Sequence, residues 1–277
     1  MMKTLLEIIP EDIEPSQSSL LLEISGEELS ITIKNDQESR FDAAAIYQFE
    51  HGIPYKNFAK ALDSTLQKHH VLKREFKEVK VVYSYPECVL MPLELFNPEN
   101  HRDMLSMVCG DMDQHTSVLT DPASDNENYT LYRIPSEIEK ILQSNYPNHH
   151  HQHLYSSLLQ VLPPKEDALY AFFSSQRIRV KLNLNGSTQL INTFEFVTPT
   201  DAAYILLYIC QQYEIPNLPI EIGGLIEKDS MLYKELYKYF HDIRFSSLPK
   251  SCRASEAISQ IPAHYFSPIF AVHACES

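Results

Sequence analysis

Near the N-terminus, apolar residues recur at every second position on both sides of a short polar turn. This two-residue period is typical of β-strands that bury one face. We therefore predict a hairpin over residues 19–33, with its turn at 25–28. The residues that carry the period are Leu20, Leu22, Ile24, Leu29, Ile31 and Ile33.

A strand, a helix and a further strand are predicted to follow this hairpin. Residues 43–50 form the predicted third strand, and Pro54 takes the first position of the helix, where its missing N–H is not needed. A fourth strand is predicted over 79–83. The helix has a four-residue apolar period on one face, made by Phe58, Leu62 and Leu66.

The second half of the chain shows the same alternating pattern. Residues 169–173 and 178–184 are predicted to form a hairpin around a polar turn at 174–177. Asn185-Gly186 is typical of a two-residue turn, and it leads to a predicted third strand at 188–196.

The elements after this third strand also match those of the first half. Thr198 to Asp201 resembles a capping box that opens a helix. A strand is predicted over 218–222, directly before a glycine pair. Both halves therefore have the order strand, strand, strand, helix, strand, which indicates a duplicated unit.

A short shared signature supports the duplication. Phe49-Glu50 precedes Pro54, and Phe194-Glu195 precedes Pro199 at an offset of 145 residues in both cases. We predict a first domain over 1–164 and a second over 165–277.

The predicted first domain contains a less regular region between the two copies. Its acidic stretch at 111–128 is expected to be a surface excursion. A short helix is predicted over 135–144, and 153–162 fits either a strand or a helix.

Composition limits the classes of ligand. The 277 residues include 23 Lys and Arg against 37 Asp and Glu, which gives a formal net charge of −14. Such a surface repels nucleic acid and anionic membranes. The longest apolar run, 202–210, is too short for membrane insertion, and no signal peptide is evident. Five scattered cysteines without a CxxC pair favour reduced thiols and a cytoplasmic protein.

Five segments together resemble a known family: 21–26, 192–196, 199–204, 220–224 and 263–266. They are similar to a family of uncharacterised Bacteroidetes proteins, DUF3822, with an actin-like ATPase fold and no assigned activity. The resemblance implies an α/β (α+β) protein. Its two duplicated ribonuclease-H-like domains would enclose an interdomain cleft.

Active members of the actin-like superfamily bind nucleotide in that cleft. The resemblance implies that three segments of this chain, here called stations, would contact the nucleotide. Hairpin turns that usually carry Asp and Gly grip phosphate, and a glycine-rich turn receives adenosine. The candidate cofactor-binding residues are Ser25, Gly26 and Glu27 in the first turn, Ser174 and Ser175 in the second, and Gly223 and Gly224 in the third.

These stations depart from the pattern of the superfamily. The first turn lacks the expected Asp, and the second lacks both Asp and Gly, so the usual handling of magnesium is lost. Backbone amides and Ser hydroxyls still bind phosphate. Taken singly, each station is also a common turn or helix entry, and only their joint arrangement favours a binding site.

No other motif assigns chemistry. The cluster His149, His150, His151 and His153 fits no standard metal spacing, and we predict that it forms a surface loop. The chain has no GxSxG, GxxxxGK[ST] or GxGxxG motif. We assign no catalytic and no metal-binding residue.

We expect a cytoplasmic actin-like protein that is a non-catalytic or weakly nucleotide-binding module. It would act through a protein partner or self-association, with neither nucleic acid nor membrane insertion. ATP with magnesium is the candidate cofactor. The alternative is an active magnesium-dependent ATPase or kinase with divergent phosphate turns.

Overall fold

The computed structural model describes residues 2–49, 55–122, 128–216 and 218–275. They form two compact units. The first holds the described residues of 2–160 and 250–260, and the second those of Val161–Pro249 and Ile261–Cys275.

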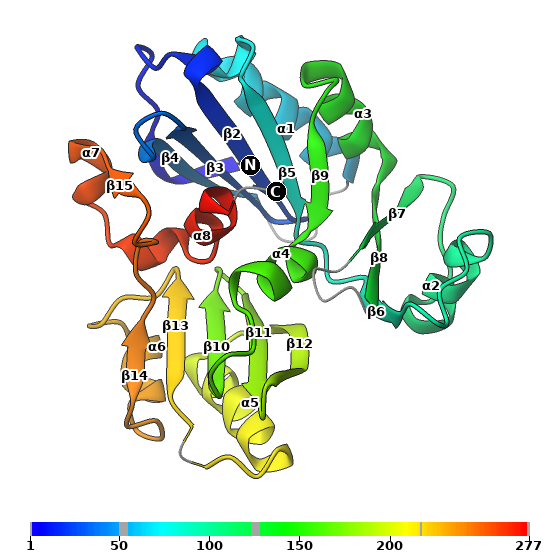
Figure 1. Cartoon of the computed structure of the whole chain (residues 1–277), viewed down its shortest axis with the longest axis vertical. Coiled ribbons are helices and arrows are strands. Elements are labelled where there is room, and N and C mark those ends of the chain that lie inside the picture. The colour runs from blue at the N-terminus through cyan, green and yellow to red at the C-terminus, as the bar shows by residue number, and fades with distance from the viewer. Residues whose placement is uncertain (1, 50–54, 123–127, 217, 276–277) are drawn as a thin grey trace. The chain divides into compact units, whose positions relative to one another are not determined.

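The first unit is built on a seven-stranded sheet. The strand order is β1-β4-β3-β2-β5-β9, and β15 pairs with β4 (Figure 1). β2, β3 and β4 form an antiparallel meander, whereas β5 runs parallel to β2 and β9 parallel to β5. The strands are β1 Met2–Ile8, β2 Ser18–Ile24, β3 Glu28–Asn35, β4 Arg40–Phe49, β5 Glu78–Tyr83, β9 His150–His153 and β15 Arg253–Ala254.

Helix α1 (Tyr55–Lys68) supplies the apolar face that covers this sheet. Phe58, Leu62 and Leu66 are buried in one hydrophobic core with the alternating residues of β2 and β3. The predicted hairpin, third strand, helix and fourth strand are thus confirmed. Glu50 and Pro54, which complete the predicted strand and helix, lie outside the described residues.

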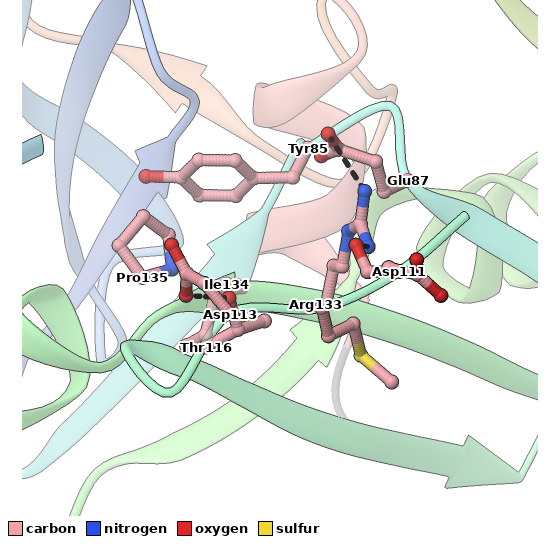
Figure 2. A pocket seen from close by; sticks show the side chains of 9 residues that line it. Tyr85, Glu87, Asp111, Asp113, Thr116, Arg133, Ile134 and Pro135 are labelled. Carbon is pink, nitrogen blue, oxygen red and sulfur yellow. Dashed lines mark hydrogen bonds and ion pairs between the residues drawn. The ribbon is translucent and has the colours of Figure 1, made fainter. Parts of the chain in front are cut away.

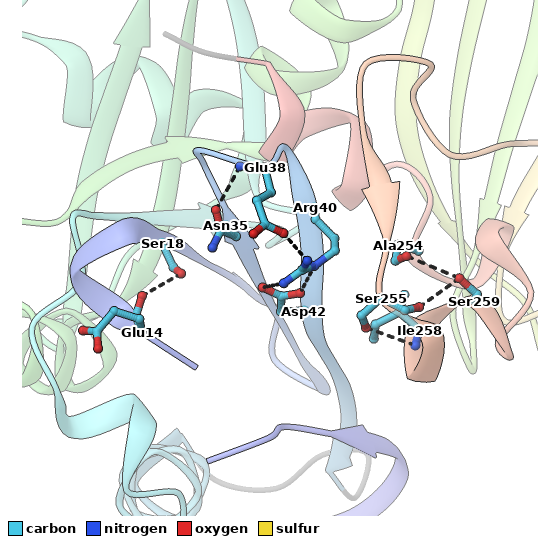
Figure 3. A network of polar contacts seen from close by, with 10 residues as sticks. All are labelled: Glu14, Ser18, Asn35, Glu38, Arg40, Asp42, Ala254, Ser255, Ile258 and Ser259. Carbon is cyan, nitrogen blue, oxygen red and sulfur yellow. Dashed lines mark hydrogen bonds and ion pairs between the residues drawn. The ribbon is translucent and has the colours of Figure 1, made fainter. Parts of the chain in front are cut away.

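The segment 250–260 lies in the first unit, although the predicted limits place it in the second domain. β15 pairs in parallel with Arg40 and Phe41, and the N–H of Ser255 donates to the carbonyl of Phe41. Ser255 Oγ then caps the short helix α7 (Glu256–Ser259), while the guanidinium of Arg40 bonds Asp42 on β4 (Figure 3).

A three-stranded antiparallel sheet is inserted between β5 and β9, in the order β6-β8-β7. The acidic stretch predicted as a surface excursion contains a whole strand of this sheet, because β7 pairs along β8. The predicted helix is confirmed as α3, and the segment after β9 is a helix, α4. The elements are β6 Cys88–Pro92, α2 His101–Cys109, β7 Thr116–Pro122, β8 Asn128–Pro135, α3 Ser136–Asn145 and α4 Leu154–Val161.

The second unit has a five-stranded sheet in the order β12-β11-β10-β13-β14 (Figure 1). Helix α5 (Pro199–Gln212) buries one face of it, and Thr198 with Asp201 forms the predicted capping box. The other elements are β10 Ala168–Phe173, β11 Arg177–Leu184, β12 Ser187–Glu195, β13 Ile220–Gly224, α6 Met231–Leu236, β14 Ile243–Phe245, the 3-10 turn η3 Ala263–Phe266 and α8 Ile269–Ala274.

The two units are copies in topology and also in register. β4-β3-β2-β5-β9 corresponds to β12-β11-β10-β13-β14, and β2 and β10 each pair in parallel with the strand after the helix. The pairing of β3 with β4 shifts after Ile33, and that of β11 with β12 shifts after Leu182. The predicted duplication is therefore confirmed.

The sequence signature that suggested the duplication does not mark equivalent positions in the strand. The N–H of Phe49 donates to the carbonyl of Glu27 in the first turn, and the N–H of Phe196 donates to that of Gln176 in the second. Phe49 therefore corresponds to Phe196 and not to Phe194. A local match in sequence missed this because it compares residue numbers, whereas the hydrogen bonds define the register of the strands.

Candidate functional site

The first candidate turn is closed by the hydroxyl of a buried serine. Ser25, 4% exposed, lies between β2 and β3, and its N–H donates to the carbonyl of Glu28 at 2.9 Å. Ser25 Oγ accepts the N–H of Glu27 at 3.2 Å and that of Glu28 at 2.9 Å. The backbone N–H groups of Glu27 and Glu28, which would face a bound phosphate, are thus already hydrogen-bonded within the turn.

The glycine of this turn is not required by the protein itself. The backbone of Gly26 has no positive φ, and a Cβ there would meet only the ring of Tyr85, at an ordinary 3.8 Å. A glycine without a steric reason is compatible with the close approach of a ligand and equally with a simple turn.

The second candidate turn is the plainer of the two. Ser174, 8% exposed, bonds the carbonyl of Arg177 through its N–H at 2.9 Å, and its hydroxyl donates to the same oxygen at 3.4 Å. Ser175 is exposed. This turn has the hydrogen bonds of a tight hairpin and presents a single exposed hydroxyl.

The glycine pair that ends β13 is explained by packing within the second unit. A Cβ on Gly223 would come within 2.9 Å of the Ser267 Cβ and 3.3 Å of the His264 carbonyl. Gly224 has φ +79°, and a Cβ there would lie 2.0 Å from the Phe173 carbonyl oxygen. Both positions therefore exclude any side chain, with or without a nucleotide.

The structure brings together the candidate residues of the second unit. Phe173 pairs with Gly224 in register, so Ser174 and Ser175 follow β10 at the same end of the sheet where the glycine pair ends β13. Ser25, Gly26 and Glu27 occupy the matching end of the first sheet. The gathering of all seven residues around one cleft remains a prediction.

A cavity of about 180 Å³ lies beside the first turn, within the first unit (Figure 2). Tyr85, whose ring neighbours Gly26, is at one side, and three carboxylates line it, those of Glu87, Asp111 and Asp113. Thr116 and the N–H of His115 both hydrogen-bond Asp113, and these bonds lower its pKa.

The one cation that lines this cavity is already engaged. The guanidinium of Arg133 donates to the carbonyls of Cys109, Gly110 and Asp111 at 3.0–3.2 Å, and it lies 3.6 Å from the Glu87 carboxylate. Figure 2 shows the guanidinium directed toward Glu87 and Asp111. The cavity is therefore acidic and unsuited to a polyphosphate. Among the described residues, no group of three or more His, Cys, Asp or Glu side chains could hold a metal ion.

The histidine cluster does not form the predicted surface loop. His150–His153 is strand β9, paired in parallel with β5, and His153 is fully buried. The prediction was wrong because four polar residues do not show the apolar alternation that marks a strand. Only the neighbouring sheet and the buried partners make this segment a strand.

A buried carboxylate organises the polar groups around β9. Asp121 on β7 accepts hydrogen bonds from the Tyr132 hydroxyl at 3.0 Å, from the His153 backbone N–H and from the Ser156 hydroxyl at 3.3 Å. Burial raises the pKa of Asp121 to about 6, against the hydrogen bonds that lower it. Asp121 thereby joins the inserted sheet to β9 and α4. No sequence motif marks this cluster, because its members are distant in the chain.

The same cluster contains a cysteine next to a histidine, but the geometry does not activate the thiol. His153 Nε2 lies 2.9 Å from the Tyr85 carbonyl, which can only accept, so the proton is on Nε2. Nδ1 then accepts from the Tyr155 N–H at 3.1 Å and faces Cys88 Sγ at 3.3 Å. Burial raises the pKa of Cys88 well above its usual value. A thiol with a raised pKa is a poor nucleophile.

Solved structures with the same fold cover nearly the whole chain. A Bacteroides thetaiotaomicron protein with an actin-like ATPase fold and unknown function is 18% identical, with a TM-score of 0.74 over 95% of this chain and 97% of that one. The PilM–PilN type IV pilus biogenesis complex is 10% identical, with a TM-score of 0.57 over 94% and 97%. The ethanolamine utilization protein EutJ from Carboxydothermus hydrogenoformans is 7% identical, with a TM-score of 0.52 over 96% and 92%.

At these identities the similarity establishes the fold alone, and the predicted actin-like ATPase fold is confirmed. In the described part of the chain, no helix combines the length and the apolar character that crossing a membrane requires. No curated protein matches the sequence. A family model matches residues 11–243, most of the chain. The chain therefore belongs to the family described as protein of unknown function, DUF3822.

Proposed function

We propose that this protein is a non-catalytic actin-like module of the cytoplasm that acts by binding a protein partner, with at most weak nucleotide binding. The observation that carries the proposal is the closure of the first turn. Ser25 Oγ accepts the N–H groups of both Glu27 and Glu28, so a phosphate would have to displace an internal hydrogen-bond acceptor.

Three further features support this proposal. Neither turn has an Asp to position hydrated magnesium, and the cavity beside the first turn is lined by carboxylates. The glycine pair, expected to receive adenosine, is explained by contacts with Phe173, His264 and Ser267. Binding a partner protein requires none of the features that these turns have lost.

One structure of the same fold agrees with a partner-binding role. One of the similar structures, with a TM-score of 0.57, is a complex in which PilM is bound to PilN. We extend to this chain only the general idea that a protein of this fold can act by holding another protein.

The test is a titration of the purified protein with ATP, ADP and GTP, with and without magnesium. A ligand that binds only the native state must raise the melting temperature by mass action. We expect no saturable shift at millimolar nucleotide. A magnesium-dependent shift accompanied by hydrolysis would support the active ATPase or kinase and reject the proposal.

A matched pair of variants sharpens this test. Ser25→Ala removes the acceptor that occupies the two amides, whereas Ser174→Ala alters a turn whose hydroxyl accepts no amide in the described contacts. If internal closure blocks phosphate, Ser25→Ala gains nucleotide affinity and Ser174→Ala does not. Equal behaviour of the two variants would show that the closure by Ser25 does not limit nucleotide binding.

A further inference from the structure

The edge strand β12 of the second unit is long and has little protection against pairing. It has nine residues, Ser187–Glu195, and Glu195 is its single charged residue. It contains no Pro and no Lys, the residues that commonly protect exposed edges. Among the described strands, only β11 pairs with β12, so one side of it has no strand.

The first unit shows what covers the corresponding edge. There β1 pairs antiparallel with β4, from Ala44 to Phe49. Because Phe49 corresponds to Phe196 and the strand registers match, the equivalent stretch of the second unit is 191–196. The internal duplication thus supplies a template for a strand that the second unit lacks in the described residues.

Aromatic side chains are buried more deeply at the covered edge of the first unit than at the edge of the second. On β4, Tyr47 and Phe49 are 0% and 2% exposed. Their counterparts Phe194 and Phe196 are only partly buried, although both pack against the core of the second unit. Two aromatic residues at a sheet edge would gain burial from one more strand.

The helix beside this edge is also suited to a strand. In the first unit, Met2 of β1 contacts Thr65 of α1, and Lys68 of α1 pairs with Glu7 of β1 at 2.6 Å. Phe58, Leu62 and Leu66 on α1 are buried at the same spacing as Ala202, Leu206 and Cys210 on α5. In this alignment Ile209 and Gln212 of α5 correspond to Thr65 and Lys68 of α1. The two positions of α5 that an added strand would contact in this way are therefore uncharged.

We propose that β12 receives an extended segment of another protein as an additional antiparallel strand along 191–196, in the place that β1 takes on β4. The segment has apolar residues at alternate positions, to pack on Phe194, Phe196 and α5, and basic residues between them. This inference rests on the proposed function and names the partner's chemistry and its site.

The net charge of the chain favours a different protein over a second copy as the occupant. Each copy of this chain carries a formal net charge of −14, so two copies repel each other, whereas a basic segment is attracted. Main-chain hydrogen bonds to an open edge give affinity, and alternate side chains give specificity.

The test begins with a random twelve-residue peptide library displayed on phage and selected on the full-length protein. We expect selected peptides that alternate apolar residues with Lys or Arg. When a selected peptide binds, hydrogen exchange of the backbone amides within 191–196 should slow. No selection, an acidic consensus, or protection that falls elsewhere would overturn the proposal.

Two substitutions of Thr193 distinguish a loss of binding at the edge of β12 from a general loss of the fold. The N–H of Thr193 donates to the Asn192 side chain at 2.8 Å, and an added strand would have to replace this acceptor. Thr193→Pro removes the donor while sparing much of the pairing with β11. It should weaken peptide binding roughly tenfold. Thr193→Val keeps the N–H and should bind as the wild type does, and circular dichroism checks the fold of both.

A second variant covers the case in which Thr193→Pro does not fold. Ile191→Lys adds a positive charge at the edge and should weaken the basic peptide while leaving the melting temperature nearly unchanged. Unchanged binding by a folded variant would contradict strand addition at this edge. Concentration-dependent dimerisation that Ile191→Lys abolishes would instead identify a second copy as the occupant and reject a foreign segment.

These results can be told apart from a failure of the proposed function. Nucleotide titration and hydrolysis examine the phosphate turns, whereas peptide selection and hydrogen exchange examine β12. A protein that hydrolyses ATP and still protects 191–196 on binding peptide would lose only the proposed absence of catalysis.

Discussion

The two copies of the ribonuclease-H-like unit use the ends of their strands differently. In the first, the strand parallel to β2 ends with Tyr83, which pairs with Ile24; in the second, Gly224 pairs with Phe173 in the same register. Tyr83 is fully buried in the first core. Gly224 has no side chain because the Phe173 backbone fills that space. The same topology thus supports a packed aromatic in one copy and close backbone contact in the other.

The copies also differ in their buried polar groups. The first unit encloses Asp121 among neutral donors next to the inserted sheet. The second encloses Lys181, 0% exposed, whose ammonium donates to Leu162, Asn183 and Thr188, and burial lowers the pKa of Lys181 to about 8. Three acceptors satisfy the three ammonium protons, so this lysine has a structural role. The two copies therefore share a topology but not their buried polar groups.

The largest effect is expected from Gly224→Ala, which disrupts the close contact between the Gly224 and Phe173 backbones in the second copy. Gly224→Ala combines a positive φ with a Cβ at 2.0 Å from a carbonyl oxygen, and we expect it to cost about 3 kcal/mol or more of unfolding free energy. Urea unfolding measures this loss. A variant as stable as the wild type would show that the end of β13 is not packed as described.

A smaller effect concerns the buried acid of the first copy. The pKa of Asp121 is raised to about 6, so the folded protein binds this proton more tightly than the unfolded chain does. Its contribution to stability is full below about pH 4 and is lost as the pH rises through 6. The free energy of wild-type unfolding should therefore gain about 2 kcal/mol over that of Asp121→Asn between pH 7 and pH 4.

The comparison with Asp121→Asn at each pH isolates this one carboxylate. The nearby His151, whose pKa is lowered by burial, titrates in both proteins and largely cancels in the difference. Denaturant unfolding at several pH values provides the measurement. Parallel curves for the two proteins would mean that Asp121 is not desolvated.

The smallest expected effect is at the glycine of the first turn. Gly26 has an ordinary backbone and free space for a Cβ, so Gly26→Ala should change the unfolding free energy by less than about 1 kcal/mol. Its contrast with Gly224→Ala tests whether the two glycines have different roles. A large loss of stability in Gly26→Ala would place an unrecognised contact at the first turn.

Much of the fold could be predicted because it depends on local pattern. The alternation around 25–28, the apolar face of α1 and the capping box before α5 each specify an element from neighbouring residues alone. The duplication followed from their order. Its exact register did not, because the offset suggested by Phe194 is not the one that the hydrogen bond of Phe196 defines.

The candidate site was less predictable than the elements around it. Its residues were correctly located at the turns and at the end of β13, since turn sequences are local signals. Whether their amides are available to a ligand depends on side-chain geometry. The closure by Ser25 Oγ and the absence of space at Gly223 cannot be inferred from residue type.

The sequence by itself determined the repeated order of three strands, a helix and a strand, the acidic character of the chain and its membership in a family, because periodicity, composition and motif are properties of the linear chain. The tertiary structure alone decided that the histidines form a strand in which His153 is buried, that Gly224 contacts Phe173, and that β4 is covered while the outer side of β12 has no strand in the described residues. Each of these depends on contacts between residues far apart in sequence, which folding brings together and which local patterns do not encode.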